Sequence, residues 1–297
     1  MDAESQITRD ASGGPARSVS RWLYGRRRVQ VAGLVGAPAL WMAVLYVGSL
    51  LSLFLTSLYQ LSEDGAHIDK TVSLDNYREL INEPVYLDVA LRTLKIAALV
   101  TLIDIVLALP IGFYMAKVVN ARWRGLLVAA VLVPLWGSYL VKAFAWRSIL
   151  GKPGGMLDAI WSPLSPGYGQ TALVIVLAYL WLPFMIIPIY AGMERLPDSL
   201  LEASSDLGAR FGVTYRRVVL PMLLPSIVAG SVFTFSLTLG DYIAVGLVGG
   251  KTQMIGSIVY SNFASNLPLA SAYAVVPVLI MVVYLLSIRR TGALENL

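Results

Sequence analysis

The chain has 297 residues, of which 57% are hydrophobic and only 14% are charged. A soluble domain usually carries about 25% charged residues, so this composition favours a protein that crosses a membrane several times. The sequence has no cysteine and one histidine, His67, which excludes thiol chemistry and a multi-histidine metal site. The net charge of +5 does not indicate a nucleic acid partner, because the basic residues flank apolar stretches rather than form one patch.

Residues 1–30 are rich in Ser, Gly and Arg, and we expect them to form a disordered cytoplasmic tail. A signal peptide is the alternative, because a basic region precedes an apolar one. However, the uncharged run from Val31 to Ser62 is far longer than the apolar region of a signal peptide, which spans about 7–15 residues. We therefore expect residues 31–88 to contain a first transmembrane helix and an outer loop.

Six stretches are apolar enough to cross a bilayer, for which a helix needs about 20 residues. The sequence therefore predicts an all-α fold, a polytopic membrane protein with six transmembrane helices. Helices two to six are expected to form one domain over residues 89–290, followed by a cytoplasmic C-terminus at 291–297. The six predicted spans are 31–55, 91–116, 125–146, 171–191, 221–247 and 270–288.

The distribution of Lys and Arg predicts the orientation, since cytoplasmic loops of membrane proteins are enriched in both. The tail, the loop after the second span, the 194–220 loop and the C-terminus each carry two or more basic residues. The alternate loops are acidic or hold a single lysine, such as Lys152 and Lys251. Both termini are therefore predicted to lie in the cytoplasm, with the protein embedded in the lipid bilayer.

The 194–220 loop has the pattern of a short helix, a turn and a second helix on the membrane surface. Ser199 and Glu202 have the spacing of a capping box, with Ser199 as the N-cap. Gly208 is placed to end the first helix in a left-handed conformation. Thr214 is a candidate cap for the second helix, and Pro221 is placed to open the fifth span. An ordinary capped surface helix explains these features equally well.

The joint spacing of five residues in this loop resembles the cytoplasmic "EAA" loop of ABC importer permeases, with Ser204 in place of the second Ala. The resemblance continues through spans two to six in Arg92–Ile96, Pro134–Trp136 with Lys142–Trp146, and Leu239–Tyr242. These motifs are similar to those of the spermidine/putrescine permease branch, in which Lys142 replaces the usual Arg. The five loop residues are Glu202, Ala203, Gly208, Leu220 and Pro221.

This resemblance implies a type I ABC importer permease fold in a bacterial inner membrane, and a subunit that performs no bond chemistry. It implies two copies of an ATPase, a second homologous permease and an extracytoplasmic solute-binding protein, with the 194–220 loop as the segment that couples this chain to the ATPase. ATP would be bound by a partner, because Gly249–Thr252 lacks the earlier glycine of a phosphate-binding loop, at Val245. The implied solute is a polyamine, with other organic solutes such as an amino-acid derivative or an opine as alternatives.

Four residues are candidates for the solute path. Asp104 lies within the second span, where a charged group is costly and indicates a function, although an interhelical hydrogen bond explains it better. Asp241 is expected about 30 Å along the fifth helix, at an exposed outer mouth. Trp181 and Tyr242 offer aromatic faces, which attract ammonium groups. Packing explains any single aromatic residue more simply.

Two other classes are weighed against an importer permease. A secondary transporter driven by an ion gradient needs paired repeats and broken helices around a midplane ion site. Asp104 alone hints at such a site, and no matching half is evident in the sequence. An intramembrane enzyme would need a nucleophile and a base, and the single histidine, His67, is predicted to lie in an outer loop.

Overall fold

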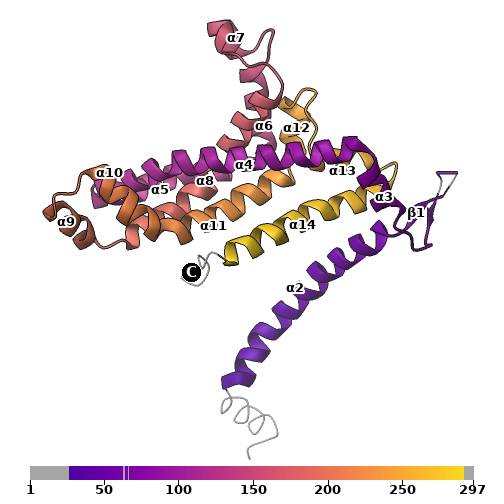
Figure 1. The fold of residues 1–297 in the computed structure, drawn as a ribbon, viewed down its shortest axis with the longest axis horizontal. Coiled ribbons are helices and arrows are strands. Elements are labelled where there is room, and N and C mark those ends of the chain that lie inside the picture. Colours follow the sequence, from indigo (N-terminus) through magenta and orange to yellow (C-terminus); the bar gives the residue numbers. More distant parts are fainter. Residues whose placement is uncertain (1–26, 63, 66, 291–297) are drawn as a thin grey trace, which may run out of the picture. The chain divides into compact units, whose positions relative to one another are not determined.

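The computed structural model describes residues 27–290 except positions 63 and 66. The described chain is helical, which confirms the predicted class, apart from one short antiparallel pair of strands (Figure 1). This pair joins β1 (Gln60–Leu61) to β2 (Ile68–Asp69) within the first long loop. The predicted segment 291–297 and most of the predicted tail lie outside the described residues.

The chain divides into two compact units, residues 1–55 and 56–297. Helix α2 (Arg27–Ser57) provides nearly all of the described part of the first unit. Its segment Leu34–Ser57 is long and apolar enough to cross a membrane. A helix that is apolar on all sides is typical of a transmembrane span.

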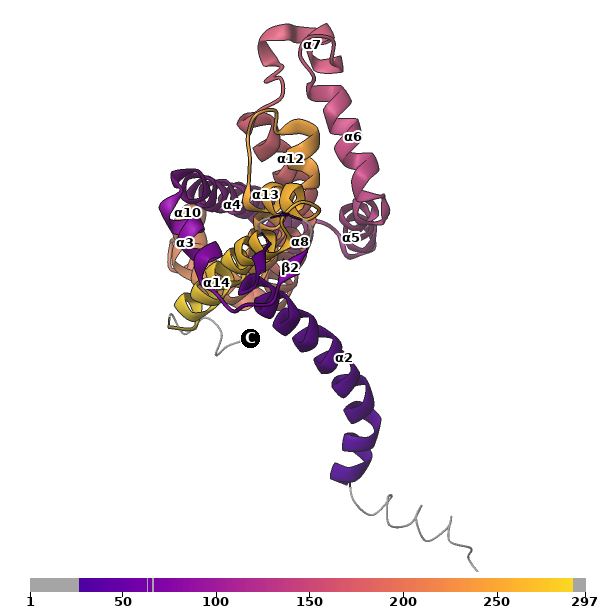
Figure 2. The same ribbon diagram turned by 90° about the vertical axis from the view of Figure 1, so that its right-hand side faces the viewer.

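Five described helical runs are long and apolar enough to cross a membrane, and a bent helix pair provides a sixth if it counts as one span. Short helices and turns connect them (Figures 1 and 2). Beyond α2, the spans are α4 (Pro84–Phe113) with the π-helical turn η1 (Tyr114–Val118), α8 (Gln170–Arg195), the run α10 (Phe211–Thr214), η3 (Tyr215–Val219) and α11 (Leu220–Leu239), and α14 (Leu267–Arg290). The connecting helices are α3 (Asp75–Asn82), α7 (Met156–Trp161), η2 (Ser162–Leu164), α9 (Asp198–Asp206), α12 (Ile243–Val248) and α13 (Ile255–Asn262).

The third predicted span is wrong as a single straight helix. It consists of α5 (Ala121–Trp136) and α6 (Tyr139–Leu150), which meet at an angle of 89°. Gly137 adopts an extended backbone at the break, and the Lys142 side chain donates to the Pro134 carbonyl at 3.0 Å. Carbonyls in the last turn of a helix lack helical partners. Lys142 provides a hydrogen-bond donor for one of them at the bend.

The fifth predicted span is also shorter than expected, because α11 ends at Leu239 and a new helix, α12, begins at Ile243. An aspartate can hydrogen-bond to nearby backbone and thereby compete with the helix. Asp241 does so by accepting from the Ala244 backbone N–H at 2.9 Å. The start of α13 covers the break, and a Cβ on Gly256 would lie 2.7 Å from the Gly240 carbonyl oxygen.

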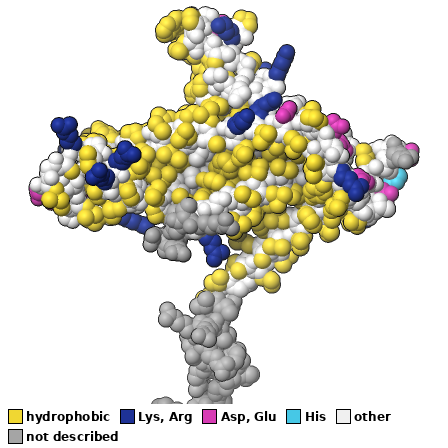
Figure 3. Space-filling model, viewed as in Figure 1, with side chains coloured by type: hydrophobic (Ala, Val, Ile, Leu, Met, Phe, Trp, Pro, Cys, Tyr) yellow, Lys and Arg dark blue, Asp and Glu magenta, His cyan; other side chains and the backbone are white. Residues whose placement is uncertain are grey.

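The core of the second unit is formed by α4, α8 and α11, which run alongside one another (Figure 1). Glycines bring these helices into close contact, as small residues do in membrane proteins. A Cβ on Gly112 would lie 2.9 Å from Ile189, and one on Gly230 would lie 2.6 Å from the Met185 sulfur. Hydrophobic side chains cover much of the length of this body, and charged side chains gather mostly toward its ends (Figure 3).

The close glycine contact predicts the effect of adding one methyl group. We expect Gly230→Ala to lower the free energy of unfolding by about 1–3 kcal/mol, because Met185 and its backbone must move. Gly125→Ala in α5 is the matched control, since nothing lies within 4 Å of its Cβ and alanine favours a helix. Thermal unfolding in detergent measures both, and equal midpoints would contradict the tight packing of α8 and α11.

Candidate functional site

The 194–220 loop contains α9 (Asp198–Asp206), which begins two residues earlier than the capping-box pattern predicts. Its N-cap is Pro197, Ser199 lies within its first turn, and no side chain caps its first backbone N–H groups. The predicted capping box of Ser199 and Glu202 is therefore wrong. Pro197 explains the difference, because its ring restricts the backbone at the helix entrance. Glu202 and Ala203 are both exposed on α9.

Gly208 follows the end of α9 and has the left-handed backbone expected from the sequence, with φ of +73°. Nothing lies within 4 Å of the position that a Cβ would take. The glycine is therefore required by backbone conformation alone, since other residues avoid positive φ. This sharp turn directs the chain from α9 toward α10.

Lys117 ties the start of α9 to the end of the second span. Its ammonium group donates to the Leu196 carbonyl and to the Asp198 carboxylate, each at 2.6 Å. The hydrogen bond from Lys117 and its positive charge lower the pKa of the exposed Asp198 carboxyl. Because a lowered pKa keeps the carboxylate charged at neutral pH, this stabilising contact is lost only as the pH falls into the acid range.

The second half of the loop is held to the first half and to α4. Ser204, which replaces the second alanine of the EAA pattern, shares a hydrogen bond of 2.7 Å with Thr214. Thr214 is the last residue of α10, and this hydrogen bond links it to α9. The prediction that Thr214 caps the second helix is wrong, because the N-cap of α10 is Arg210. Phe113 at the end of α4 contacts the rings of Phe211 and Tyr215.

The loop presents apolar side chains that contact little of the described chain. Leu207 is 88% exposed, and three other apolar residues of the loop are exposed as well. Exposed apolar residues that cluster next to polar ones mark interaction surfaces. We call this surface the loop face; it consists of Leu200, Glu202, Ala203, Leu207, Phe211 and Val213.

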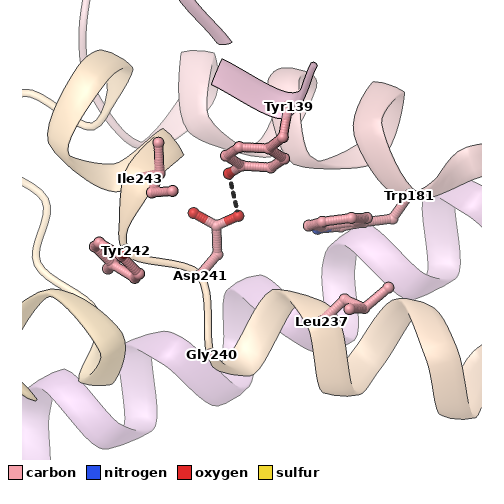
Figure 4. A pocket seen from close by; sticks show the side chains of 7 residues that line it. All are labelled: Tyr139, Trp181, Leu237, Gly240, Asp241, Tyr242 and Ile243. Carbon is pink, nitrogen blue, oxygen red and sulfur yellow. Dashed lines mark hydrogen bonds between the residues drawn. The ribbon is translucent and has the colours of Figure 1, made fainter. Parts of the chain in front are cut away.

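At the opposite end of α11, a cavity of about 220 Å³ opens at the helix break. Asp241 projects into it and accepts a hydrogen bond from the Tyr139 hydroxyl (Figure 4). The Ala244 backbone N–H donates to both the Asp241 carboxylate and the Tyr139 oxygen, at 2.9 and 3.2 Å. Asp241 is only 7% exposed, so its predicted position at an exposed outer mouth on a continuous helix is wrong.

Two aromatic rings form a wall of the same cavity. Trp181 of α8 stacks on Tyr139 of α6, with ring centroids 5.8 Å apart and planes inclined by 21°. Tyr242 lies on the other side of the break from Trp181 (Figure 4). The structure thus brings together Trp181, Asp241 and Tyr242, which are candidates from the sequence. A carboxyl group beside aromatic faces is suited to bind an organic cation.

Sequence reasoning missed several lining residues of this cavity. Tyr139 follows the Gly137–Ser138 break, and a Gly-Ser pair within an apolar run is the signal that could have indicated a bend there. The remaining missed residues carry no such signal, since their place depends on how α11 ends. They are Leu237, Gly240 and Ile243.

Asp104 does not line the cavity. It is 0% exposed within α4, and neither carboxyl oxygen has a hydrogen-bond partner among the described residues. The interhelical hydrogen bond expected from the sequence is therefore absent in this structure. One turn earlier, Thr101 uses its hydroxyl to donate to the Ala97 carbonyl of its own helix, at 2.8 Å. In the described part of the chain, no group of three or more His, Asp or Glu residues could hold a metal ion.

The helical fold, with its loop face at one end and its polar cavity at the other, matches known transport proteins. Residues 97–292 match the family described as "Binding-protein-dependent transport system inner membrane component". The chain is 40% identical to the inner membrane ABC transporter permease protein YdcU of Escherichia coli, over 89% of this chain and 90% of that protein. It is 31% identical to the spermidine/putrescine permease PotB of Haemophilus influenzae, over 80% of this chain and 85% of that protein.

Solved structures show the same fold at lower identity. A bacterial ABC transporter that imports alginate matches with a TM-score of 0.68 and 14% identity, over 92% of this chain and 98% of that chain. The methionine transporter MetNI matches with a TM-score of 0.54 and 20% identity, over 72% of this chain and 98% of that chain. These similarities confirm the predicted type I importer permease fold.

The chain belongs to the family of binding-protein-dependent inner membrane transport components. It is a multi-pass membrane permease subunit of an ATP-driven ABC importer, as its motifs predict. The alternative of an ion-gradient-driven transporter is not favoured, since the matches with permeases cover most of the chain.

The unpartnered carboxyl of Asp104 predicts an unusual response to substitution. We expect Asp104→Leu to raise the free energy of unfolding by about 1–3 kcal/mol, because it removes a buried polar group that has no hydrogen bond. Thr93→Val is the matched control on the same helix and should destabilise, since Thr93 accepts from the Ile255 backbone N–H at 3.0 Å. Thermal unfolding in detergent compares them.

A lower midpoint for Asp104→Leu would contradict this prediction and show that the carboxyl has a partner in the assembled protein. Transport by the same variant addresses a separate question. Higher stability combined with lost transport would indicate that the importer uses the carboxyl during its cycle.

Proposed function

We propose that this permease carries an organic cation of the polyamine class across a bacterial inner membrane. The observation that supports this proposal is the cavity in which the Asp241 carboxyl faces the rings of Tyr139 and Trp181. Negative charge and aromatic faces both attract ammonium groups, and the water-poor surroundings strengthen each attraction. The similarity to PotB, whose name includes spermidine and putrescine, supports the same solute class.

In this proposal the chain has no ATPase site of its own and works with three kinds of partner. The complex holds two copies of an ATPase, one of which docks on the loop face; a second homologous permease completes the path, and an extracytoplasmic binding protein delivers the solute. The loop face is placed in the cytoplasm together with both termini, because the basic residues gather in these segments. The cavity then lies toward the outer side.

The proposed coupling runs from the loop face into the membrane helices. Lys117 holds α9 to the end of α4, and the Ser204–Thr214 hydrogen bond holds the two halves of the loop together. A displacement of α9 by the ATPase would therefore be passed to α4 and α11 as a discrete shift. Gly208, Leu220 and Pro221 position the loop, whereas Glu202 and Ala203 form part of the docking surface.

The exposure of Glu202 allows a sharp test of docking. Glu202 makes no capping bond, so Glu202→Lys should leave thermal stability nearly unchanged while reducing copurification of the ATPase several-fold. Glu79→Lys is the control for charge, because it makes the same change on an exposed residue of α3 and removes only a 3.4 Å hydrogen bond from the Tyr86 hydroxyl. If Glu202→Lys copurifies the ATPase as well as the unchanged protein does, α9 is an ordinary surface helix.

The cavity predicts a charge effect on transport. Asp241→Asn keeps the shape of the side chain and removes its charge, so we expect a several-fold loss of uptake at limiting solute while ATPase copurification is retained. Because Asp241 is buried, added salt should alter this effect little, unlike that at an exposed charge. The measurement is uptake of labelled spermidine into proteoliposomes that contain the complete importer. Uptake that does not change on removal of the carboxyl would contradict a cation site there.

A further inference from the structure

A second, larger cavity adjoins the one at Asp241 and has a different character. It has a volume of about 460 Å³ and lies between the end of α11, α13 and α14. Its lining contains no charged side chain and is dominated by aliphatic and aromatic groups, among them Ile255, Val259 and Pro277. Such a surface offers no opposite charge to an ammonium group and favours methylene groups.

The two cavities share lining residues at the helix break. Gly240 and Tyr242 line both of them, and Asp241 lies between these two residues in the chain. The break is held in place by α13, because a Cβ on Gly256 would lie only 2.7 Å from the Gly240 carbonyl oxygen and 2.8 Å from that of Asp241. The apolar cavity therefore stands in a fixed position beside the carboxyl.

Aromatic rings provide an open wall of the second cavity. Tyr242 stacks on Tyr260 of α13, with ring centroids 4.7 Å apart and planes inclined by 18°. Tyr260 and Phe263 are each 65% exposed, so most of each side chain does not pack against other residues of this chain. Flat aromatic surfaces of this kind bury a methylene chain without requiring one defined orientation.

We infer that the Tyr242–Tyr260 cavity holds the apolar segment of an elongated cation whose ammonium group lies beside Asp241. This inference rests on the proposed cation transport and adds the residues that discriminate between cations. Each additional methylene that enters the cavity should favour the solute about fourfold, the ratio that corresponds to about 0.8 kcal/mol per buried CH₂. Compact cations would reach only the first cavity, and neutral chains only the second.

The test compares transport of α,ω-diamines of increasing length by the complete importer, with its ATPase, partner permease and binding protein, in proteoliposomes. The quantity measured is the ratio of uptake by the variant to uptake by the unchanged permease for each diamine, at equal binding protein. This ratio cancels the selectivity of the binding protein. We expect Tyr260→Ala to lower it progressively, up to about fourfold for each methylene added.

Tyr260→Phe is the matched control, because it keeps the ring and should leave the ratio independent of diamine length. Phe263→Ala provides a second substitution in the same cavity, in case Tyr260→Ala assembles poorly. An equal loss for every diamine in both alanine variants would overturn the inference and assign these rings to packing with lipid or a partner, while an Asp241→Asn effect would still uphold cation transport. A failure of all diamines to be transported by the unchanged importer would overturn both.

Discussion

Backbone polar groups in a membrane must be satisfied within the protein, and the break between α11 and α12 shows how this chain meets that constraint. The Asp241 carboxylate and the Tyr139 oxygen both accept from the Ala244 backbone N–H, and Gly256 allows α13 to cover the exposed carbonyls. Asp241 and Tyr139, which stabilise the break, also line the polar cavity. The site therefore exists because a membrane helix ends there.

The other end of the bundle follows from close contacts between helices rather than from helix capping. Glycines at the α4–α8 and α8–α11 contacts let the three helices pack as one body, and Lys117 fastens the 194–220 loop to it. Two π-helical turns, η1 and η3, lie where this body meets the loop. Such turns are frequent at functional sites, which agrees with the coupling proposed for this loop.

The helical class, the family and most spans could be predicted, because a long apolar run and a spaced polar motif are local properties of the sequence. The bend at Gly137 has a local signal in the Gly137–Ser138 pair, whereas the break at Gly240 depends on partners from other helices, which no local pattern indicates. Asp241 illustrates the difference: its residue type indicated a function, but its burial required Tyr139 from another span. Similarly, Ser199 and Glu202 have capping-box spacing, yet Pro197 sets the start of α9.

One helix, α11, leads from the loop to the polar cavity. Its 20 residues, Leu220–Leu239, correspond to about 30 Å of rigid rod. If nucleotide binding at one end changes the binding free energy of solute in the cavity, thermodynamic linkage requires that bound solute changes the binding free energy of nucleotide by the same amount. In the proposed coupling, a solute in the cavity would therefore change the affinity of the ATPase for nucleotide through α11, so that solute delivery and ATP use are two effects of one equilibrium.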